Sequence, residues 1–325
     1  MKVLITGGAG FLGSHLADAW LDRGDEVFLL DTCSSVKIRH RLGHTRLHFI
    51  RDSVFNETIL EGLIARVDLV YHLAAVVGVE HYVGDPYEVL NVNVNGTQNV
   101  LKLAFKHAKR VVFSSTSEVY GRNLKVPWRE DDDRVLGPTS IDRWCYSTSK
   151  AIGEHFCFAF SKLGLPVTVL RYFNVYGPRL DAIDVGRVIT IFLGQVLRSR
   201  PLTVVGDGCQ TRCFTYVSDA IAATVAAGLV PEAVGGVFNV GSDTEVSIRI
   251  LAEQIIRIAS SPSKIIFVPP EAVYGSSYED IPRRVPHIER MREILGVTPK
   301  ISLDEGLQRT IEYFREETAH GGMRE

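Results

Sequence analysis

Residues 6–13 read Thr-Gly-Gly-Ala-Gly-Phe-Leu-Gly, and this stretch decides the fold. It follows a short apolar run and opens a segment, 12–23, whose apolar residues recur at helical spacing. Gly7, Gly10 and Gly13 fit a G-x-x-G-x-x-G pattern, in which glycines allow a tight turn and a close approach of the backbone to a pyrophosphate. The start of the helix offers free N–H groups and a positive dipole end to the phosphates. The stretch therefore predicts a dinucleotide-binding loop between a strand and a helix.

An acidic residue, Asp31, stands at the end of the second apolar run, about 20 residues after the glycines. A carboxylate at this position holds a ribose hydroxyl and repels a 2′-phosphate, so it favours NAD over NADP. The basic residues between Lys37 and Arg51 leave NADP open as an alternative. Three histidines in the same stretch recur every four residues, but Gly43 interrupts them and no carboxylate accompanies them. We therefore expect no metal site there.

Short apolar runs alternate with helical patterns through the first half of the chain. The expected strands are 2–6, 27–30, 47–50, 69–73, 111–114 and 167–171, and the expected helices are 12–23, 55–66, 86–107 and 148–164. Strands buried on both faces and separated by helices predict an α/β fold with a doubly wound parallel (Rossmann) sheet. Residues 177–325 contain more Pro and Gly and predict a smaller C-terminal α+β lobe. We expect the first domain to span 1–176, with some later elements free to return to its sheet.

Composition narrows the class of protein. The 325 residues correspond to about two domains, and 46% hydrophobic with 23% charged residues excludes wholesale disorder. Lys+Arg 36 against Asp+Glu 38 gives a net charge of −2, so no nucleic acid and no membrane surface is expected as partner. No apolar run approaches the roughly 20 residues that cross a bilayer. Five cysteines without a CxxC pair favour a reducing cytoplasm, although Cys209 and Cys213 are close enough in sequence to pair.

A second motif, Tyr146-Ser147-Thr148-Ser149-Lys150, places a phenol and an ammonium one helical turn apart. A phenol normally has a pKa near 10. A neighbouring cation and the positive nicotinamide ring of bound NAD both favour the phenolate and so lower this pKa. Tyr146 is therefore predicted to be a general base that takes a proton from a substrate hydroxyl while hydride leaves the same carbon.

Several segments together resemble the extended short-chain dehydrogenase/reductase superfamily, which includes nucleotide-sugar epimerases, dehydratases and decarboxylases. They are TGGAGFLGSHL at 6–16, YHLAA at 71–75, NVNGT at 93–97, SSTSEVYG at 114–121, YSTSK at 146–150, RYFNVYGPR at 171–179 and two later stretches, 206–220 and 295–315. The resemblance covers essentially the whole chain. It implies NAD as cofactor, a nucleotide sugar (most simply a UDP-sugar) bound by the C-terminal lobe, and a homodimer through helices 86–107 and 148–164.

The resemblance also implies roles for individual residues. The implied catalytic residues are Thr116, Glu118, Tyr146, Lys150 and Arg284. The residues implied at the cofactor are Gly7, Gly10, Phe11, Leu12, Gly13, Asp31, Asp52, Leu73, Ala74, Ala75, Asn93, Tyr146, Lys150 and Tyr172. Those implied at the nucleotide sugar are Tyr82, Thr116, Glu118, Asn174, Arg179, Arg187, Leu202, Val204, Arg212 and Arg284.

Two features bear on the reaction. Glu118 lies two residues after Thr116, where 4-epimerases of the superfamily usually carry a non-acidic residue; through a water it could return a proton to C5 of the sugar. Residues 280–286 resemble the segment of UDP-glucuronate decarboxylases whose arginine faces the substrate carboxylate, and Arg284 takes that place, although Val285 replaces the usual lysine. These features predict a UDP-glucuronate decarboxylase that works through a 4-keto intermediate. A nucleotide-sugar 4-epimerase is the alternative; a 4,6-dehydratase and a catalytically silent NAD-binding protein are further ones.

Overall fold

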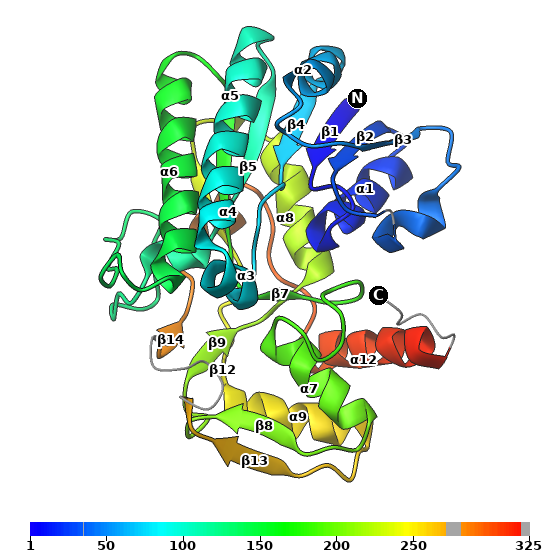
Figure 1. Cartoon of the computed structure of the whole chain (residues 1–325), viewed down its shortest axis with the longest axis vertical. Helices are drawn as coiled ribbons and strands as arrows, with labels where there is room; N and C mark the ends of the chain where they lie inside the picture. Colours follow the sequence, from blue (N-terminus) through cyan, green and yellow to red (C-terminus); the bar gives the residue numbers. More distant parts are fainter. Residues whose placement is uncertain (35, 271–280, 320–325) are drawn as a thin grey trace.

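The computed structural model describes residues 1–34, 36–270 and 281–319. Its centre is a parallel seven-stranded sheet in the order β11-β6-β5-β4-β1-β2-β3 (Figure 1). The strands are β1 (Lys2–Thr6), β2 (Glu26–Asp31), β3 (Leu47–Arg51), β4 (Leu69–His72), β5 (Arg110–Thr116), β6 (Val167–Tyr172) and β11 (Val237–Val240). The predicted doubly wound α/β sheet is confirmed. The strand order reverses between β1 and β4, and the carboxyl edge at such a point is where ligands bind in these folds.

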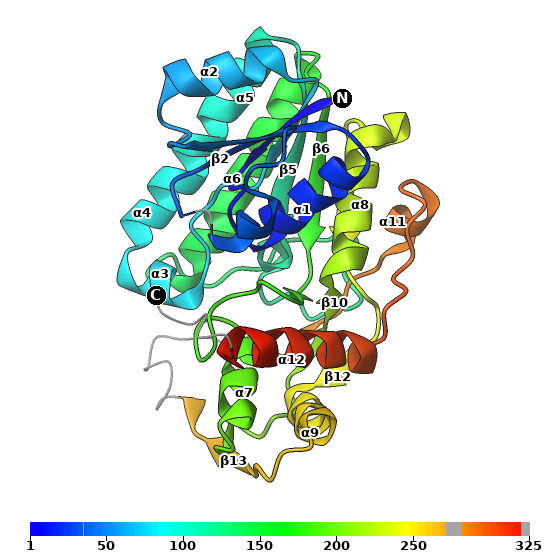
Figure 2. The same cartoon turned by 90° about the vertical axis from the view of Figure 1, so that its right-hand side faces the viewer.

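Helices cover both faces of this sheet, as Figure 2 shows. One face carries α1 (Phe11–Asp22) and α8 (Val217–Leu229), and the other carries α2 (Glu57–Arg66), α4 (Pro86–Leu90), α5 (Thr97–Lys106) and α6 (Arg143–Lys162). Successive residues of a strand point to opposite faces. In β1, Val3 and Ile5 accordingly join the core under α1 and α8, whereas Leu4 joins the core under α2 and α5. Because each face of the sheet is buried in a core, both sets of alternating residues are apolar, and each strand is therefore a continuous apolar run.

Two expected helices differ in detail from the structure. The expected helix 86–107 is α4 followed by a π-helical turn, η2 (Asn91–Gly96), and then α5. The π turn gives Asn93 a position from which its side chain binds the backbone of Val76 on both the N–H and the carbonyl side. Helix α6 begins at Arg143 rather than at 148, so the whole Tyr-x-x-x-Lys motif lies within it.

The C-terminal lobe lies beyond the carboxyl edge of the sheet (Figure 1). It contains α7 (Val188–Leu197), α9 (Ile248–Ala259), α12 (Leu303–Ala319) and the parallel pair β8 (Leu202–Val205) and β13 (Ile265–Val268). The chain leaves this lobe and comes back, because α8 and β11 return to the central sheet and α11 (Glu289–Glu293) packs on β11. The lobe is therefore not one continuous segment from residue 177.

Further short elements lie beside the sheet and in the lobe. They are α3 (Val79–Gly84), α11 (Glu289–Glu293), the pair β7 (Val175–Tyr176) and β10 (Thr215–Tyr216), the three-stranded set β12 (Glu245–Ser247), β9 (Thr211–Cys213) and β14 (Arg283–Arg284), and the 3₁₀ turns η1 (Val36–Arg41), η3 (Ser117–Tyr120) and η4 (Pro231–Ala233). All five cysteines are free thiols, so Cys209 and Cys213 form no disulfide. Within the described ranges, no helix has both the length and the apolar character that crossing a bilayer requires.

Candidate active site

The glycine-rich loop is packed tightly against the end of strand β4. Gly7 has a φ of +72°, and a Cβ on it would lie 2.7 Å from the backbone nitrogen of Ala74. A Cβ on Gly13 would collide with the carbonyl oxygen of Gly7. Helix α1 has no side-chain cap, so its first N–H groups, on Phe11 and Leu12, remain available to phosphate oxygens. This loop fits the pyrophosphate of a dinucleotide.

Two carboxylates end the neighbouring strands β2 and β3. Asp31 accepts a hydrogen bond from the Ala9 N–H at 2.9 Å, which ties the glycine loop to the end of β2. Asp52 accepts one from the side chain of Asn56 at 2.9 Å. Strands β2 and β3 lie on the side of β1 opposite to β4, so both acids are on that side of the glycine loop. Asp31 stays the predicted partner of the ribose, and Asp52 stays that of the adenine.

Tyr146 lies in the first turn of α6, beside the end of β5. Its phenol is hydrogen-bonded to Thr116, and Tyr82 stacks on its ring with the centroids 6.1 Å apart. Asn93 donates to the Ser149 hydroxyl at 3.1 Å, and Ser149 donates to the carbonyl of Tyr146 at 2.8 Å. The π turn thus braces the helix at the point where the predicted base is held.

In the protein chain alone, the Tyr146 phenol is not activated. Burial and the nearby Glu118 carboxylate raise the pKa of Tyr146 to about 12, although Thr116 and Arg187 act in the opposite direction. The Lys150 ammonium does not offset this rise. Lys150 alone therefore does not activate the phenol, and the predicted lowering of the Tyr146 pKa with NAD bound stays a prediction.

The reason lies in the position of Lys150. Its Nζ donates to the carbonyl of Ser114 at 2.8 Å, within the buried end of β5. Burial lowers the pKa of Lys150 to about 8, while Cys157 and Glu154 act to raise it. The ammonium is therefore anchored to the strand and supplies positive charge from beneath the site.

Glu118 lies at the centre of a cluster of three arginines that come from three separate elements. Its Oε1 is 2.5 Å from Nη1 of Arg284 in β14, and its Oε2 is 3.4 Å from Nη2 of Arg143 at the start of α6. Arg212 in β9 acts on the same carboxylate, and strand pairing sets Arg212 directly beside Arg284. The side chains of Glu118, Arg143 and Arg284 are 14%, 2% and 9% exposed, so the cluster is buried.

These charges change the expected role of Glu118. Burial alone would raise the pKa of Glu118, but Arg284 and Arg143 outweigh burial and lower the pKa to about 2. Glu118 is therefore ionised at neutral pH and carries no proton. Its charge holds the two guanidinium groups in place, and the expectation that it returns a proton to C5 of the sugar through a water stays a prediction.

The predicted nucleotide-binding residues fall in different places. Arg187 lies over the ring of Phe11, 6.0 Å from its centroid, at the mouth of the glycine loop. Asn174 donates to the carbonyl of Cys213 at 2.9 Å, next to Arg212 in β9. Arg187 also donates to Asp181 at 3.1 Å, so both predicted residues are held by contacts within the chain.

Other predicted residues have side chains committed elsewhere. Arg179 donates to Asp18 of α1 at 2.7 Å and is also hydrogen-bonded to the His15 ring, so its guanidinium ties the loop after β7 to α1 rather than facing a diphosphate. Tyr172 is hydrogen-bonded to Thr224 of α8 at 2.7 Å, inside the core. Leu202 and Val204 have no exposed surface. Packing therefore removes these side chains from the surface on which a nucleotide would bind.

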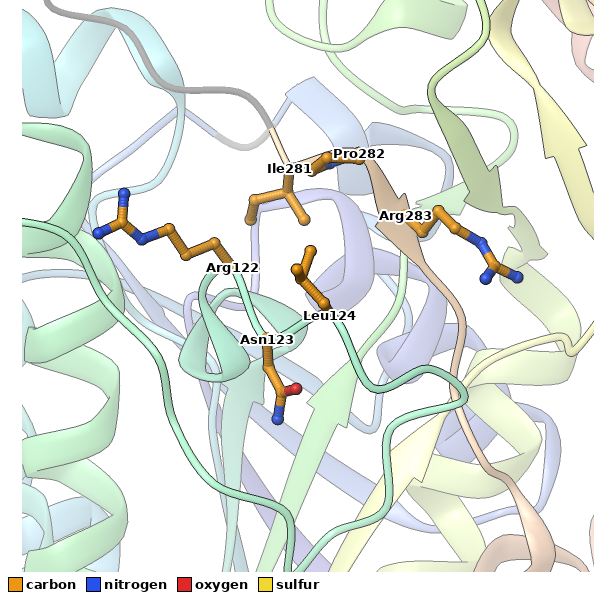
Figure 3. Close-up of a pocket in the computed structure, with 6 residues that line it drawn as sticks. All are labelled: Arg122, Asn123, Leu124, Ile281, Pro282 and Arg283. Carbon is orange, nitrogen blue, oxygen red and sulfur yellow. The ribbon is translucent and has the colours of Figure 1, made fainter.

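A small hollow lies beside the segment 280–286, of which Asp280 is outside the described residues. Figure 3 shows Ile281 and Leu124 facing each other across it. Its volume of about 50 Å³ is far too small for a nucleotide sugar. Arg283 points away from it and pairs with Glu245 through two contacts of 2.8 Å. Arg283 and Arg284 are thus adjacent in sequence but belong to different ion pairs.

Sequence reasoning did not place Arg143 among the site residues. The signal was present, since Arg143 precedes Tyr146 by three residues and so stands one helical turn before it. What was missing was the position of Glu118, which follows β5 and faces this turn.

Comparison with known proteins agrees with this geometry. Residues 3–241 match the model of the NAD dependent epimerase/dehydratase family. The chain is 43% identical to the UDP-N-acetyl-alpha-D-glucosaminuronate decarboxylase of Bacillus cytotoxicus, with 97% of this chain and 98% of the relative covered. It is 38% identical to UDP-glucuronic acid decarboxylase 1 of Arabidopsis thaliana, over 97% of this chain and 70% of the relative.

A solved structure shares the whole fold. The UDP-glucuronic acid 4-epimerase of Bacillus cereus, in complex with UDP-glucuronic acid and NAD, is 32% identical, with a TM-score of 0.87 and coverage of 97% of this chain and 99% of that one. The strand order, the glycine loop, the Tyr-x-x-x-Lys helix and these matches lead to one conclusion: the chain belongs to the NAD dependent epimerase/dehydratase family.

Proposed function

We propose that the protein is an NAD-dependent decarboxylase of a UDP-hexuronate that works through a 4-keto sugar. The observation that carries the proposal is the buried guanidinium of Arg284. It forms an ion pair with Glu118, which lies close to the hydrogen-bonded pair of Thr116 and Tyr146. Its Nε is buried and has no hydrogen-bond partner among the described residues. Such a donor fits a carboxylate of the substrate, because guanidinium groups bind carboxylates through paired hydrogen bonds. The curated relatives, which are named as uronate decarboxylases, support the same reading.

The cofactor is NAD, held by the glycine loop and the carboxylate of Asp31. The tight packing of Gly7 and Gly13 and the uncapped start of α1 are the features that fit it. When bound, NAD accepts hydride from C4 of the sugar and returns it at the end of the cycle, so none is consumed.

The oxidation of C4 depends on Tyr146. The phenolate takes the proton of the 4-hydroxyl group, and Thr116 hydrogen-bonds the same oxygen. Because the pKa of Tyr146 is about 12 in the chain alone, the phenolate requires added positive charge at the site. Lys150, anchored on Ser114, contributes part of this charge from below.

Loss of CO₂ follows from the ketone. A ketone at C4 makes the C6 carboxylate a β-keto acid, so the C5–C6 bond breaks and its electron pair forms an enolate across C5 and C4. Tyr146 and Thr116 donate hydrogen bonds to the enolate oxygen, as in an oxyanion site. Arg284 orients the carboxylate before CO₂ leaves. A proton from solvent then adds to C5, so that each turnover consumes one proton and releases one CO₂.

The test is mass spectrometry of products from UDP-glucuronate, UDP-N-acetylglucosaminuronate and UDP-glucose. We expect the loss of about 44 mass units, the mass of CO₂, from at least one uronate and no change in UDP-glucose. An unchanged mass with altered retention would instead show a 4-epimerase, the loss of about 18 mass units a dehydratase, and no turnover a silent binder. Each of these three outcomes contradicts the proposal.

We further propose that the protein is a cytoplasmic homodimer. Exposed apolar side chains occur on α4, at the end of α5 and just after α6, namely Tyr87, Leu90, Phe105 and Leu163. Pairing this face with a second copy would form a four-helix bundle and cover these side chains. Five free thiols suit a reducing compartment. Light scattering should give twice the chain mass of 36.1 kDa, and a monomer at micromolar concentration would contradict the dimer.

A further inference from the structure

A second ionic network lies beneath Thr116 and Tyr146, and the proposed reaction does not involve it. Glu154 of α6 and Arg171 of β6 form a bidentate ion pair, with Nη2–Oε2 at 2.6 Å and Nε–Oε1 at 2.9 Å. Arg171 also donates to the Tyr120 hydroxyl and the Glu130 carbonyl, each at 2.8 Å. Glu154 and Arg171 are only 5% and 6% exposed. The pair is therefore almost completely withdrawn from water.

The network is built into the catalytic framework. Tyr146, Lys150 and Glu154 recur every four residues on α6, so they share one face of the helix. Lys150 donates to the carbonyl of Ser114, and Glu154 accepts a short hydrogen bond from the hydroxyl of Ser115. Successive turns of α6 thus hold successive residues of β5. The next residue of that strand is Thr116, which binds the Tyr146 phenol.

Stability alone does not explain a charge pair in this place. Removing two charges from water is costly, and replacing a buried ion pair by apolar residues is often neutral or stabilising. A buried pair that joins α6 to β5 and β6 at the reacting end of the sheet is better explained by what it does to the neighbouring catalytic groups.

We propose that Glu154, locked by Arg171, is a positioning residue for the oxidation at C4: its fixed carboxylate lies one helical turn from Lys150, where it opposes the ammonium, and holds the Ser115–Thr116 strand end against the catalytic helix. The inference rests on the proposed function only in naming the reaction that Lys150 serves. The effect of the Glu154 carboxylate on the Lys150 ammonium can be measured without turnover.

The surroundings of Lys150 single out Glu154. The groups that act on the ammonium are Cys157 and Glu154 on α6, His72 on β4, and Phe113 and Ser114 on β5, and Arg171 on β6 is ion-paired with Glu154. Burial lowers the pKa of His72 to about 3 and raises that of Cys157, so both are neutral near pH 7. Among these described neighbours, Glu154 is therefore the one that brings negative charge to oppose the effect of burial on Lys150.

The experiment titrates Lys150 directly by NMR of protein labelled with ¹³C at lysine Cε, with Lys150→Met assigning its signal. We expect a titration near pH 8 in the wild type and at least about one pH unit lower in Glu154→Gln. Glu130→Gln is the matched control: Glu130 is equally buried at 5% and hydrogen-bonds Asn239 in the same network, yet does not act on Lys150. Glu154→Asp, which keeps the charge, should titrate close to the wild type.

Several outcomes decide the proposal. An unchanged Lys150 titration in Glu154→Gln, or an equal shift in Glu130→Gln, would overturn it. If Glu154→Gln does not fold, Glu154→Gln/Arg171→Met removes both buried charges, and a wild-type titration in that variant would overturn it too. In active enzyme the alkaline limb of the kcat profile should move with the NMR titration. A wild type that titrates as expected but turns over no uronate would contradict the proposed function and leave this inference standing.

Discussion

The proposed cofactor site and the proposed sugar site of this protein are built from the chain in opposite ways. The cofactor site comes from one continuous strand–loop–helix–strand unit that ends at Asp31. The proposed sugar site joins Glu118, Arg143, Arg212 and Arg284, which lie on four elements spread over half of the chain. The first depends on backbone shape and the second on mutual charge. Single substitutions should therefore impair the cofactor site when they disturb the backbone, and the sugar site when they remove a charge.

The largest effect is expected where the two sites meet, at Tyr146. Tyr146→Phe removes the proton acceptor but keeps the ring that stacks on Tyr82. Turnover should fall by about 10³-fold, the scale of general-base catalysis. Calorimetry should show that NAD and the nucleotide sugar still bind. Activity within tenfold of the wild type would remove Tyr146 from the mechanism.

On the cofactor side, Gly13→Ala should weaken NAD binding by about 100-fold or more. The added methyl group collides with the Gly7 carbonyl and forces the loop away from α1. Gly62→Ala in α2 is the matched control, because a Cβ there meets nothing within 4 Å and alanine favours the helix. Fluorescence titration of NADH measures both variants, and equal affinities would show that the loop does not hold the cofactor.

On the sugar side, Arg284→Ala should lower kcat/KM for the uronate by about 100-fold while NAD affinity stays unchanged. The neighbouring Arg283→Ala breaks only an exposed pair with Glu245 and should cost less than about threefold. Steady-state kinetics on both variants gives the comparison. A similar loss in the two variants would mean that Arg284 has no special contact with the carboxylate.

The smallest effect concerns stability and pH. Because Arg284 and Arg143 hold the pKa of Glu118 at about 2 against an unfolded value of 4.5, its stabilising contribution is complete above pH 4.5 and is lost as the pH falls toward 2. The wild type should therefore be more stable than Glu118→Gln at pH 7, and this advantage should shrink by about 2 kcal/mol between pH 5 and pH 3. Urea unfolding at several pH values measures it, and a constant difference would show that Glu118 is not held ionised.

The same contrast explains what the sequence could predict. The glycine loop, Asp31 and the Tyr146–Lys150 spacing are local patterns, and the structure places the loop and the helix where the patterns predict them. The diversion of Arg179 to Asp18, the position of Lys150 on Ser114 and the low pKa of Glu118 all depend on contacts between distant segments. No periodicity records such contacts, so the charge states of the site required the fold.

The helix and strand features that the sequence did not predict also depend on contacts between distant segments. The π turn at Asn93 was missed because it is set by a side chain that reaches back to Val76, not by local apolar spacing. Strand β11, whose sequence is Val-Phe-Asn-Val, was not among the expected strands; from the sequence we expected only that some later elements could return to the sheet. Packing against β6 decides where it goes.

The most direct test of the account uses UDP-glucuronate or its 2-acetamido counterpart labelled with ¹³C at C6, followed by NMR in ²H₂O. The account predicts that the label leaves as CO₂ and bicarbonate in step with formation of a UDP-pentose that carries one deuterium at C5. If instead all of the label remains in a UDP-hexuronate whose configuration at C4 is inverted, the arginine cluster around Glu118 does not serve decarboxylation and the central claim is wrong.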